Sequence, residues 1–516
     1  MEKSQQQITR AAALVMVAFA VSRILGLVRQ MVFSHYFGAG PEMDAYVAAI
    51  RIPDALFMII AGGALGSAFI PLFAARITLG ETGAAWRLAS AIVNLLLVVL
   101  VPITLLCILL APWLVQTLIA PALPPDIQAQ TAALMRVMLL STAIFGVSGI
   151  VMGVLNAHQH FLLPAIAPVL YNLALIGGAI WGGCTGIGTM GVAIGMVVGA
   201  ASHLLIQVPG LLRHHMRYTL TLGRGDAGVL EVGRLMIPRM LGVAAWQLNL
   251  VVSNNFASWW GVGAISALDY AYHLMLLPQG IFAQAVGTAA FPTFAAQAAR
   301  GAFDELRATL LATFRMVLAI TLPASAGLIL LGRPLIAMLF QYGAFDVDAT
   351  HGVAWALSMF VLGLVAYAAV EVLARAFYAL QDTWTPAWAA VVSVVLNVLL
   401  SFAFPPLFDR AGAPAHAGLA LANAVATTLE MLILLAIVYR RIHGFNVRRL
   451  LGFTLRALGA TLGMSAGLWI WLTVTPPNAW LQTLGGIALG VLLYAGMAVL
   501  FRIDELNQAM LTLLRR

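Results

Sequence analysis

The chain has 516 residues, of which 62% are hydrophobic and only 9% are charged, with a formal net charge of +8. Soluble proteins carry roughly 25% charged residues, so this composition excludes an ordinary soluble protein and indicates a membrane protein. The positive charge then reflects membrane topology and contact with anionic lipids, and no nucleic-acid partner is expected. Cys107 and Cys184 have no partner spacing, so neither a disulfide framework nor a metal site is expected.

Apolar segments long enough to cross a bilayer recur from end to end. A span needs about 20 apolar residues because the hydrocarbon core is about 30 Å thick. The segments lie at residues 10–36, 43–74, 84–113, 130–154, 162–182, 186–212, 232–260, 266–298, 307–332, 350–380, 385–404, 415–439, 452–474 and 480–501. They predict an all-α polytopic membrane protein with about 14 transmembrane helices. The first run continues into a full-length span, so no cleavable signal peptide is expected.

The arginines are distributed unevenly over the connecting loops. The loops after even-numbered segments hold most of them, for example Arg213, Arg217, Arg440 and Arg441, whereas loops 114–129 and 261–265 contain neither Lys nor Arg. Positively charged loops stay in the cytoplasm. The asymmetry therefore predicts that both termini are cytoplasmic.

The chain matches itself at one nearly constant shift. Residues 66–75 (GSAFIPLFAA) align with 287–296 (GTAAFPTFAA), and residues 157–159 (AHQ) align with 379–381 (ALQ), 221 and 222 positions later. The matches predict two six-helix lobes in a parallel pseudo-repeat, followed by two C-terminal helices. The predicted domains are residues 1–222, 223–445 and 446–516. Parallel repeats of this kind are typical of transporters; the alternative is that small residues and proline simply recur in membrane proteins.

Arginines in the first two segments are the most informative residues. Arg23 and Arg29 lie in the first segment and Arg51 in the second. A cation at membrane depth costs several kcal/mol, so one that is retained usually faces a cavity and meets an anion. We therefore expect a water-filled chamber that receives a negatively charged substrate. The alternative for Arg29 is that its side chain extends to the membrane surface.

Two carboxylates accompany Arg51. Asp44 and Arg51 are seven residues apart, which places them on one helical face, and Asp54 lies near that face. These residues are candidates for substrate binding, although the same spacing suits an ion-pair set that satisfies itself.

The second half contains fewer intramembrane charges. Its candidates are Arg239 and His273 for the substrate, and Asp269, Glu371 and Glu430 for ion coupling. Asp269 and His273 have the i, i+4 spacing of a proton-responsive pair or of a local hydrogen bond. Glu371 and Arg375 have the favourable order for a local ion pair, and Glu430 stands alone in its segment.

No catalytic motif accompanies these charges. The sequence has no phosphate-binding loop, no acidic metal motif and no nucleophile set with suitable spacing. We therefore expect a transporter without enzymatic activity or cofactor, driven by a Na⁺ or H⁺ gradient, the membrane potential or the substrate gradient.

Several motifs together resemble one family. They are residues 22–29 (SRILGLVR), 37–40 (FGAG), 44–46 (DAY), 51–53 (RIP), 63–71 (GALGSAFIP), 155–157 (LNA), 267–271 (ALDYA), 341–343 (QYG) and 377–379 (FYA). The combination is similar to the MurJ/MviN family of the multidrug/oligosaccharidyl-lipid/polysaccharide exporter group. The resemblance covers residues 20–440.

The resemblance implies fourteen helices in two lobes with a central cationic cavity. It also implies a bacterial cytoplasmic membrane location, alternating access, and a place beside the cell-wall synthesis machinery. The implied substrate is lipid II, an undecaprenyl-pyrophosphate-linked disaccharide-pentapeptide that is flipped to the outer leaflet for peptidoglycan synthesis. Arg23, Arg29, Asp44 and Arg51 match charged positions of the family, and guanidinium groups suit a pyrophosphate.

The chain departs from the family pattern at several charged positions. Phe57 and Met58 stand where many members have arginines, Gly62 replaces an acidic residue, and His273 replaces an arginine. Arg239 is a candidate substitute. These departures leave room for a different polyprenyl-pyrophosphate-linked oligosaccharide as the substrate.

Three other functions fit this sequence less well than lipid transport. A cation-coupled drug antiporter would favour carboxylates over arginines in its cavity. A membrane glycosyltransferase would need a catalytic carboxylate and large outer loops, which this sequence lacks. A scaffold without transport activity would leave the intramembrane arginines unexplained.

Overall fold

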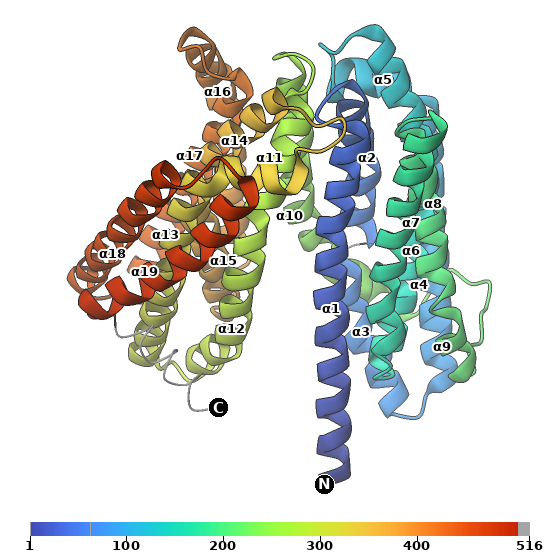
Figure 1. Cartoon of the computed structure of the whole chain (residues 1–516). Helices are drawn as coiled ribbons and strands as arrows, with labels where there is room; N and C mark the ends of the chain where they lie inside the picture. Colours follow the sequence, from blue (N-terminus) through green and yellow to red (C-terminus); the bar gives the residue numbers. More distant parts are fainter. Residues whose placement is uncertain (1, 62, 504–516) are drawn as a thin grey trace. The chain divides into compact units, whose positions relative to one another are not determined.

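The computed structural model describes residues 2–61 and 63–503, without the side chains of residues 2–16, 19, 61–68, 238, 239, 241, 245, 281 and 282. All regular structure in these residues is helical, as predicted (Figure 1). The chain divides into two compact units. Unit 1 comprises Met1–Ser266 and Gly343–Phe345, and unit 2 comprises Ala267–Tyr342 and Asp346–Arg516.

Unit 1 is a bundle in which α6 packs on α2, α4 and α8, and α1 runs beside α7 (Figure 1). Its elements are α1 (Glu2–Phe37), α2 (Pro41–Leu56), the π-helix η1 (Phe57–Ala61), α3 (Gly63–Thr78), α4 (Thr82–Leu109), α5 (Ala111–Leu114), η2 (Val115–Ile119), α6 (Pro125–Ala157), α7 (Leu162–Thr185), α8 (Met190–Leu205), α9 (Val208–Arg213) and α10 (Ala227–Ser258). Large apolar side chains of α3, α4 and α6, among them Phe69, Phe73 and Leu155, form its core.

Unit 2 begins within α11. In this unit α16 packs on α17, and α18 packs on α13 and α19. Its elements are α11 (Ala264–Pro278), η3 (Gln279–Ala283), α12 (Gln284–Ala299), α13 (Phe303–Phe340), α14 (Val347–Leu362), α15 (Leu364–Ala379), α16 (Trp384–Arg410), α17 (Ala415–Arg441), α18 (Val447–Val474), η4 (Leu481–Gly485) and α19 (Gly486–Leu500). One apolar core joins α13, α15 and α17, and a second joins α13 to α18 and α19.

Ten helices in the described residues are long and apolar enough to cross a membrane, or eleven if α14 and α15, bent by 44°, form one span. The chain is therefore a multi-pass membrane protein, but the predicted number of fourteen spans is not confirmed. The other three predicted segments coincide with α1 and with the helix pairs α2–α3 and α11–α12. Each of these pairs is interrupted by a π-helix, so neither is one regular helix.

The sequence repeat reappears in the backbone. The π-helix η1 begins at Phe57 and η3 begins at Gln279, 222 positions later, while α6 and α15 end at Ala157 and Ala379. Two residues after each of these ends, Gln159 and Gln381 adopt left-handed conformations with φ of 57° and 59°. Left-handed residues also follow α9, α17 and α19 at His215, His443 and Arg502, so it is the common shift of 222 positions, and not this conformation, that agrees with the sequence repeat.

Helix α10 belongs to unit 1, although the repeat predicts that it opens the second lobe. It packs on α2 and α3. The Asn255 side-chain amide donates to the Leu118 carbonyl at 2.8 Å, and the Ser258 hydroxyl accepts from the Ala122 N–H at 3.3 Å. These contacts are consistent with the boundary between the compact units after Ser266. The boundary predicted at residue 222 concerns the sequence repeat and stays a prediction.

A short loop segment of the second half also belongs to unit 1. The Ala344 N–H donates to the His35 carbonyl at 2.9 Å, at the end of α1. Gly38 and Gly343 both have φ of 62°. A Cβ atom at Gly38 would lie 2.4 Å from the Ala344 carbonyl oxygen, so only glycine permits this close approach.

The turns after α6 and α15 differ in chemistry, although their backbones match. After α15, Asp382 caps α16 by accepting from the Trp384 and Thr385 N–H groups at 3.0 Å, and it pairs with Arg441 at 2.7 Å. At the equivalent position after α6 stands His160, whose ring lies edge-on to His214 at 5.9 Å. Unit 1 therefore has histidines where unit 2 has an ion pair.

The histidines of unit 1 form a stack. The His158 and His214 rings are parallel within 11° at 4.1 Å, and Trp86 stacks on His158 at 6.1 Å. Burial and the charge of His214 lower the pKa of His158, while burial and the neighbouring charges of His160, His215 and Arg213 lower the pKa of His214. The stack is therefore most stable when both rings are neutral.

The segment that leads into α10 is fixed to α3 and α4. Arg76 donates to the two carboxylate oxygens of Asp226 at 3.0 and 2.5 Å and to the Ala84 carbonyl at 3.0 Å. Asp226 also caps α10 by accepting from the Gly228 N–H at 2.8 Å. The Arg76 hydrogen bonds lower the pKa of Asp226. This clamp joins the helix start to the α3–α4 turn.

Replacing Arg76 with Met should destabilise unit 1 by about 1 kcal/mol, because the clamp is partly exposed and screened. Since the pKa of Asp226 is lowered in the folded state, the clamp stabilises above the ordinary Asp pKa of about 4 and is lost as the pH falls through the folded pKa. Chemical unfolding of the detergent-solubilised protein measures both effects. An unchanged unfolding midpoint would show that the clamp contributes nothing.

The His158–His214 stack should make stability sensitive to mild acid. Both pKa values are lowered on folding, so the contribution is complete above the ordinary histidine pKa of about 6.5 and decreases as the pH falls through it, when the unfolded chain binds protons first. His214→Phe keeps a ring in the stack and should flatten this dependence of the melting temperature. His351→Phe, at an exposed histidine of unit 2, is the matched control and should leave the wild-type dependence unchanged.

Candidate functional site

Arg23, the first of the predicted substrate-binding arginines, lies on the exposed face of α1. Arg23 is exposed and forms neither a hydrogen bond nor an ion pair with any other described residue. It stands one and a half helical turns before Arg29. A guanidinium in this position keeps all five N–H donors available for a ligand.

Arg29 points from α1 to a neutral partner on α7. Its Nη1 donates to Asn172 Oδ1 at 3.3 Å, and its guanidinium lies 5.8 Å from the centre of the Phe33 ring. The buried Nε–H has no acceptor, and no ion pair of a described residue includes Arg29. The positive charge of Arg29 is therefore positioned by an amide and a ring without being neutralised by a carboxylate.

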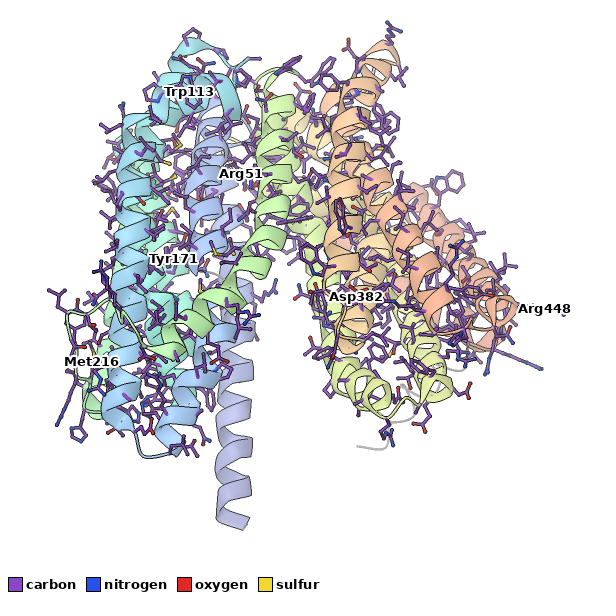
Figure 2. All side chains as sticks on the ribbon, turned by 180° about the vertical axis from the view of Figure 1, so that it is seen from behind. Arg51, Trp113, Tyr171, Met216, Asp382 and Arg448 are labelled. Carbon is purple, nitrogen blue, oxygen red and sulfur yellow. The ribbon has the colours of Figure 1, made fainter. Side chains whose placement is uncertain are left out.

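Arg51 lies on α2 where this helix runs beside α10 (Figure 2). Its Nε donates to Asn254 Oδ1 at 3.3 Å, and the buried Asn254 Nδ2 has no acceptor. About two turns earlier on α10, Gln247 donates to the Asp54 backbone carbonyl at 3.2 Å. Arg51 and Asp54 are thus brought beside the amides of α10, as a polar seam on two apolar helices.

Asp44 binds backbone N–H groups at the start of α11, a contact that the sequence pattern did not predict. The residue is 0% exposed, and its two oxygens accept from the Gly263 N–H at 2.5 Å and the Ser266 N–H at 2.7 Å. It therefore caps the start of α11, where the N–H groups lack helical partners. Its shared face with Arg51 does not decide its contacts, and a contact with substrate stays a prediction.

The remaining predicted substrate residues are less completely placed. The side chain of Arg239 and all of Gly62 lie outside the described residues. In unit 2, His273 Nδ1 lies 2.8 Å from the Asp269 carbonyl oxygen and 3.2 Å from its carboxylate. Phe57 and Met58 form the start of η1, where Phe57 packs on Phe145 with ring centres 5.5 Å apart.

Two of the three predicted coupling carboxylates, Glu371 and Glu430, differ in their partners. Glu371 pairs with Arg375 at 2.8 Å, as the spacing predicts, and Arg375 also donates to Thr288. Glu430 on α17 is hydrogen-bonded by Ser393 of α16. In the described residues no group of three or more His, Cys, Asp or Glu side chains could hold a metal ion.

Two residues of α7 belong to the arginine environment but were missed by the sequence analysis. Asn172 binds Arg29, and Tyr171 interacts with the charges of Asp54 and Arg29 (Figure 2 labels Tyr171). An amide at membrane depth is a recognisable signal, since it needs a partner there. The partner itself lies 143 positions away, which a local pattern cannot show.

Comparison with known proteins identifies relatives that share nearly the whole chain. Residues 33–485 match the family described as lipid II flippase MurJ. The lipid II flippase MurJ of Burkholderia cenocepacia is 32% identical over 461 residues, which cover 88% of each chain. The probable lipid II flippase MurJ of Rhizobium tropici is 32% identical over 82% of this chain and 79% of its own.

Solved structures show the same fold. A lipid II flippase MurJ in an inward closed conformation superposes with a TM-score of 0.80 and 26% identity, over 95% of this chain and 99% of its own. An inward-facing multidrug resistance transporter of the MATE family superposes with a TM-score of 0.70 at 17% identity, over 83% of this chain and 98% of its own. At that identity the second likeness concerns the fold alone. The match over most of the chain and the identity of the curated relatives place this protein in the lipid II flippase MurJ family.

Proposed function

We propose that this flippase carries lipid II from the inner to the outer leaflet of the bacterial cytoplasmic membrane by alternating access, and that Arg23, Arg29 and Arg51 receive its pyrophosphate. The observation that carries this assignment is the environment of Arg29: a guanidinium inside an apolar bundle, held by a neutral amide and with a buried Nε–H that lacks an acceptor. Such a cation is costly at membrane depth unless an anion joins it. A pyrophosphate supplies that anion.

The chemistry of the three arginines suits a diphosphate. A guanidinium donates two parallel hydrogen bonds to neighbouring phosphate oxygens, and these charge-assisted bonds are about twice as strong as neutral ones. Arg29 and Arg51 are each oriented by an asparagine, at 3.3 Å in both cases. At Arg29 the asparagine holds the guanidinium without neutralising it, so the charge is kept for the substrate.

The other residues have proposed roles around these arginines. Asp44 positions the start of α11 through its two backbone hydrogen bonds. Asp54, Arg239 and His273 adjust the charge that the substrate meets. The arginine-rich loops are proposed to face the cytoplasm together with both termini, and cell-wall synthesis enzymes are the proposed downstream partners.

The substrate assignment is tested with purified protein in proteoliposomes. Lipid II, a polyprenyl-pyrophosphate with a different oligosaccharide, and a polyprenyl monophosphate are each placed in the outer leaflet, and their movement to the other leaflet is followed. Preferential movement of lipid II supports the proposal. Equal or faster movement of the other pyrophosphate glycan would assign that class of substrate to the protein instead.

Replacing Arg23 with Ala should abolish growth rescue in a bacterial strain depleted of its own lipid II flippase, because the substrate loses an exposed guanidinium. Arg307→Ala, at a surface ion pair with Asp304, is the matched control and should rescue as well as the wild type. Immunoblots of the membrane fraction verify equal amounts. Full rescue by Arg23→Ala would remove Arg23 from the proposed site.

The Asn172–Arg29 pair should act as one unit. A charge-assisted hydrogen bond contributes about 1.5–3 kcal/mol, so Arg29→Gln should slow lipid II movement by roughly ten- to hundredfold. Asn172→Leu should slow it less, since it only releases the guanidinium. If Asn172 acts through Arg29, the double variant should be no slower than Arg29→Gln alone. Additive effects in the proteoliposome assay would show that Asn172 acts separately.

A further inference from the structure

A carboxylate stands alone near the middle of a membrane helix in unit 2. Glu430 lies in α17, which ends at Arg441, and a rise of 1.5 Å per residue places it about 16 Å from that end. Among the ion pairs of the described residues, none includes Glu430. An ionised carboxylate without a counter-charge is costly at this depth, and a neutral carboxylic acid is much less so.

Hydroxyl and amide groups continue from Glu430 along α17. Thr427 and Asn423 precede it by three and seven residues, so the three side chains share one helical face. Thr427 donates to the Asn423 carbonyl at 2.9 Å, and the Tyr367 hydroxyl of α15 donates to Asn423 Oδ1. Tyr367 also interacts electrostatically with Glu430.

The facing helix α16 carries a matching row. Ser393, Asn397 and Ser401 are spaced four residues apart and are all buried, and Ser401 donates to the Asn397 carbonyl at 2.7 Å. Helices α16 and α17 are consecutive and packed on one another, and we refer to their two rows of hydroxyl and amide side chains as the α16–α17 seam. Ser393 hydrogen-bonds Glu430 at the end of the seam.

The charged groups around the seam are already engaged or lie at its ends. On α15, Glu371 is paired with Arg375 at 2.8 Å, and at the end of α17 Arg441 is paired with Asp382 at 2.7 Å (Figure 2 labels Asp382). At the other end, His416 of α17 lies 3.0 Å from the Gly352 carbonyl oxygen of α14. The remaining titratable residues of helices α14 to α17 are Asp348, His351, Tyr378, Asp409, Arg410, Tyr439 and Arg440.

We propose that Glu430 is a proton-binding site, which exchanges its proton through the α16–α17 seam, and that this exchange couples a proton gradient to transport. The chemistry is a single protonation of the carboxylate to the acid and its reversal, with no other bond changed. A proton needs one carboxylate and hydrogen-bonding neighbours, which is what the seam provides. The coupling part of this inference rests on the proposed lipid II transport, whereas the proton site does not.

Infrared difference spectroscopy tests the site without any lipid substrate. Lipid-reconstituted protein is taken from mildly alkaline to mildly acid pH, and the carbonyl stretch of newly formed carboxylic acid is recorded. The wild type and Glu305→Gln, a surface control paired with Arg300, should both show a band that Glu430→Gln loses. Ser393→Ala should keep the band and move its midpoint pH, because the hydrogen bond to the carboxylate is removed. An unchanged band in Glu430→Gln would overturn the proposal.

Proteoliposomes with an imposed proton gradient test the coupling. Lipid II movement by the wild type and by Glu305→Gln should be accelerated several-fold by the gradient, and Glu430→Gln should lose this acceleration. Stimulation of Glu430→Gln equal to that of the wild type, or stimulation by a Na⁺ gradient alone, would overturn the coupling. A Glu430-dependent infrared band without any lipid II movement would support the proton site and contradict the proposed substrate.

Discussion

A polar group inside the membrane must find a hydrogen-bond partner within the protein, because the hydrocarbon offers none. This constraint explains the arrangement of almost every polar side chain described here. Asp44 accepts from two N–H groups at the start of α11, and Asn172 and Asn254 accept from guanidinium donors. Satisfaction is incomplete at the buried Nε–H of Arg29, which has no acceptor among the described residues.

The helical fold could be predicted because its signals are local. An apolar run of about 20 residues predicts a membrane helix from composition alone, and the Glu371–Arg375 pair follows from a spacing of four residues on one helix. The interruptions at η1 and η3 were not predicted, since a π-helix inserts one residue into a turn without a composition signal. Those interruptions account for part of the difference between the predicted fourteen spans and the ten or eleven that are regular.

The site was only partly predictable because its partners are distant in the chain. Arg29 and Arg51 could be selected from the cost of burying their charge, but Asn172 and Asn254 lie 143 and 203 positions away from them. The helical face shared by Asp44 and Arg51 suggested a joint role, whereas Asp44 is occupied by the backbone of α11. Local spacing therefore identifies which residues need partners, and the packing of the helices decides which partners they obtain.

The loop around Ala344 affects how the chain is divided between the two units. Its residues Gly343–Phe345 belong to unit 1, although α13 before it and α14 after it belong to unit 2. The chain therefore passes from one unit to the other three times, after Ser266, Tyr342 and Phe345. The two units are therefore not independent stretches of chain: the connection between α13 and α14 of unit 2 passes through residues that are hydrogen-bonded to the end of α1.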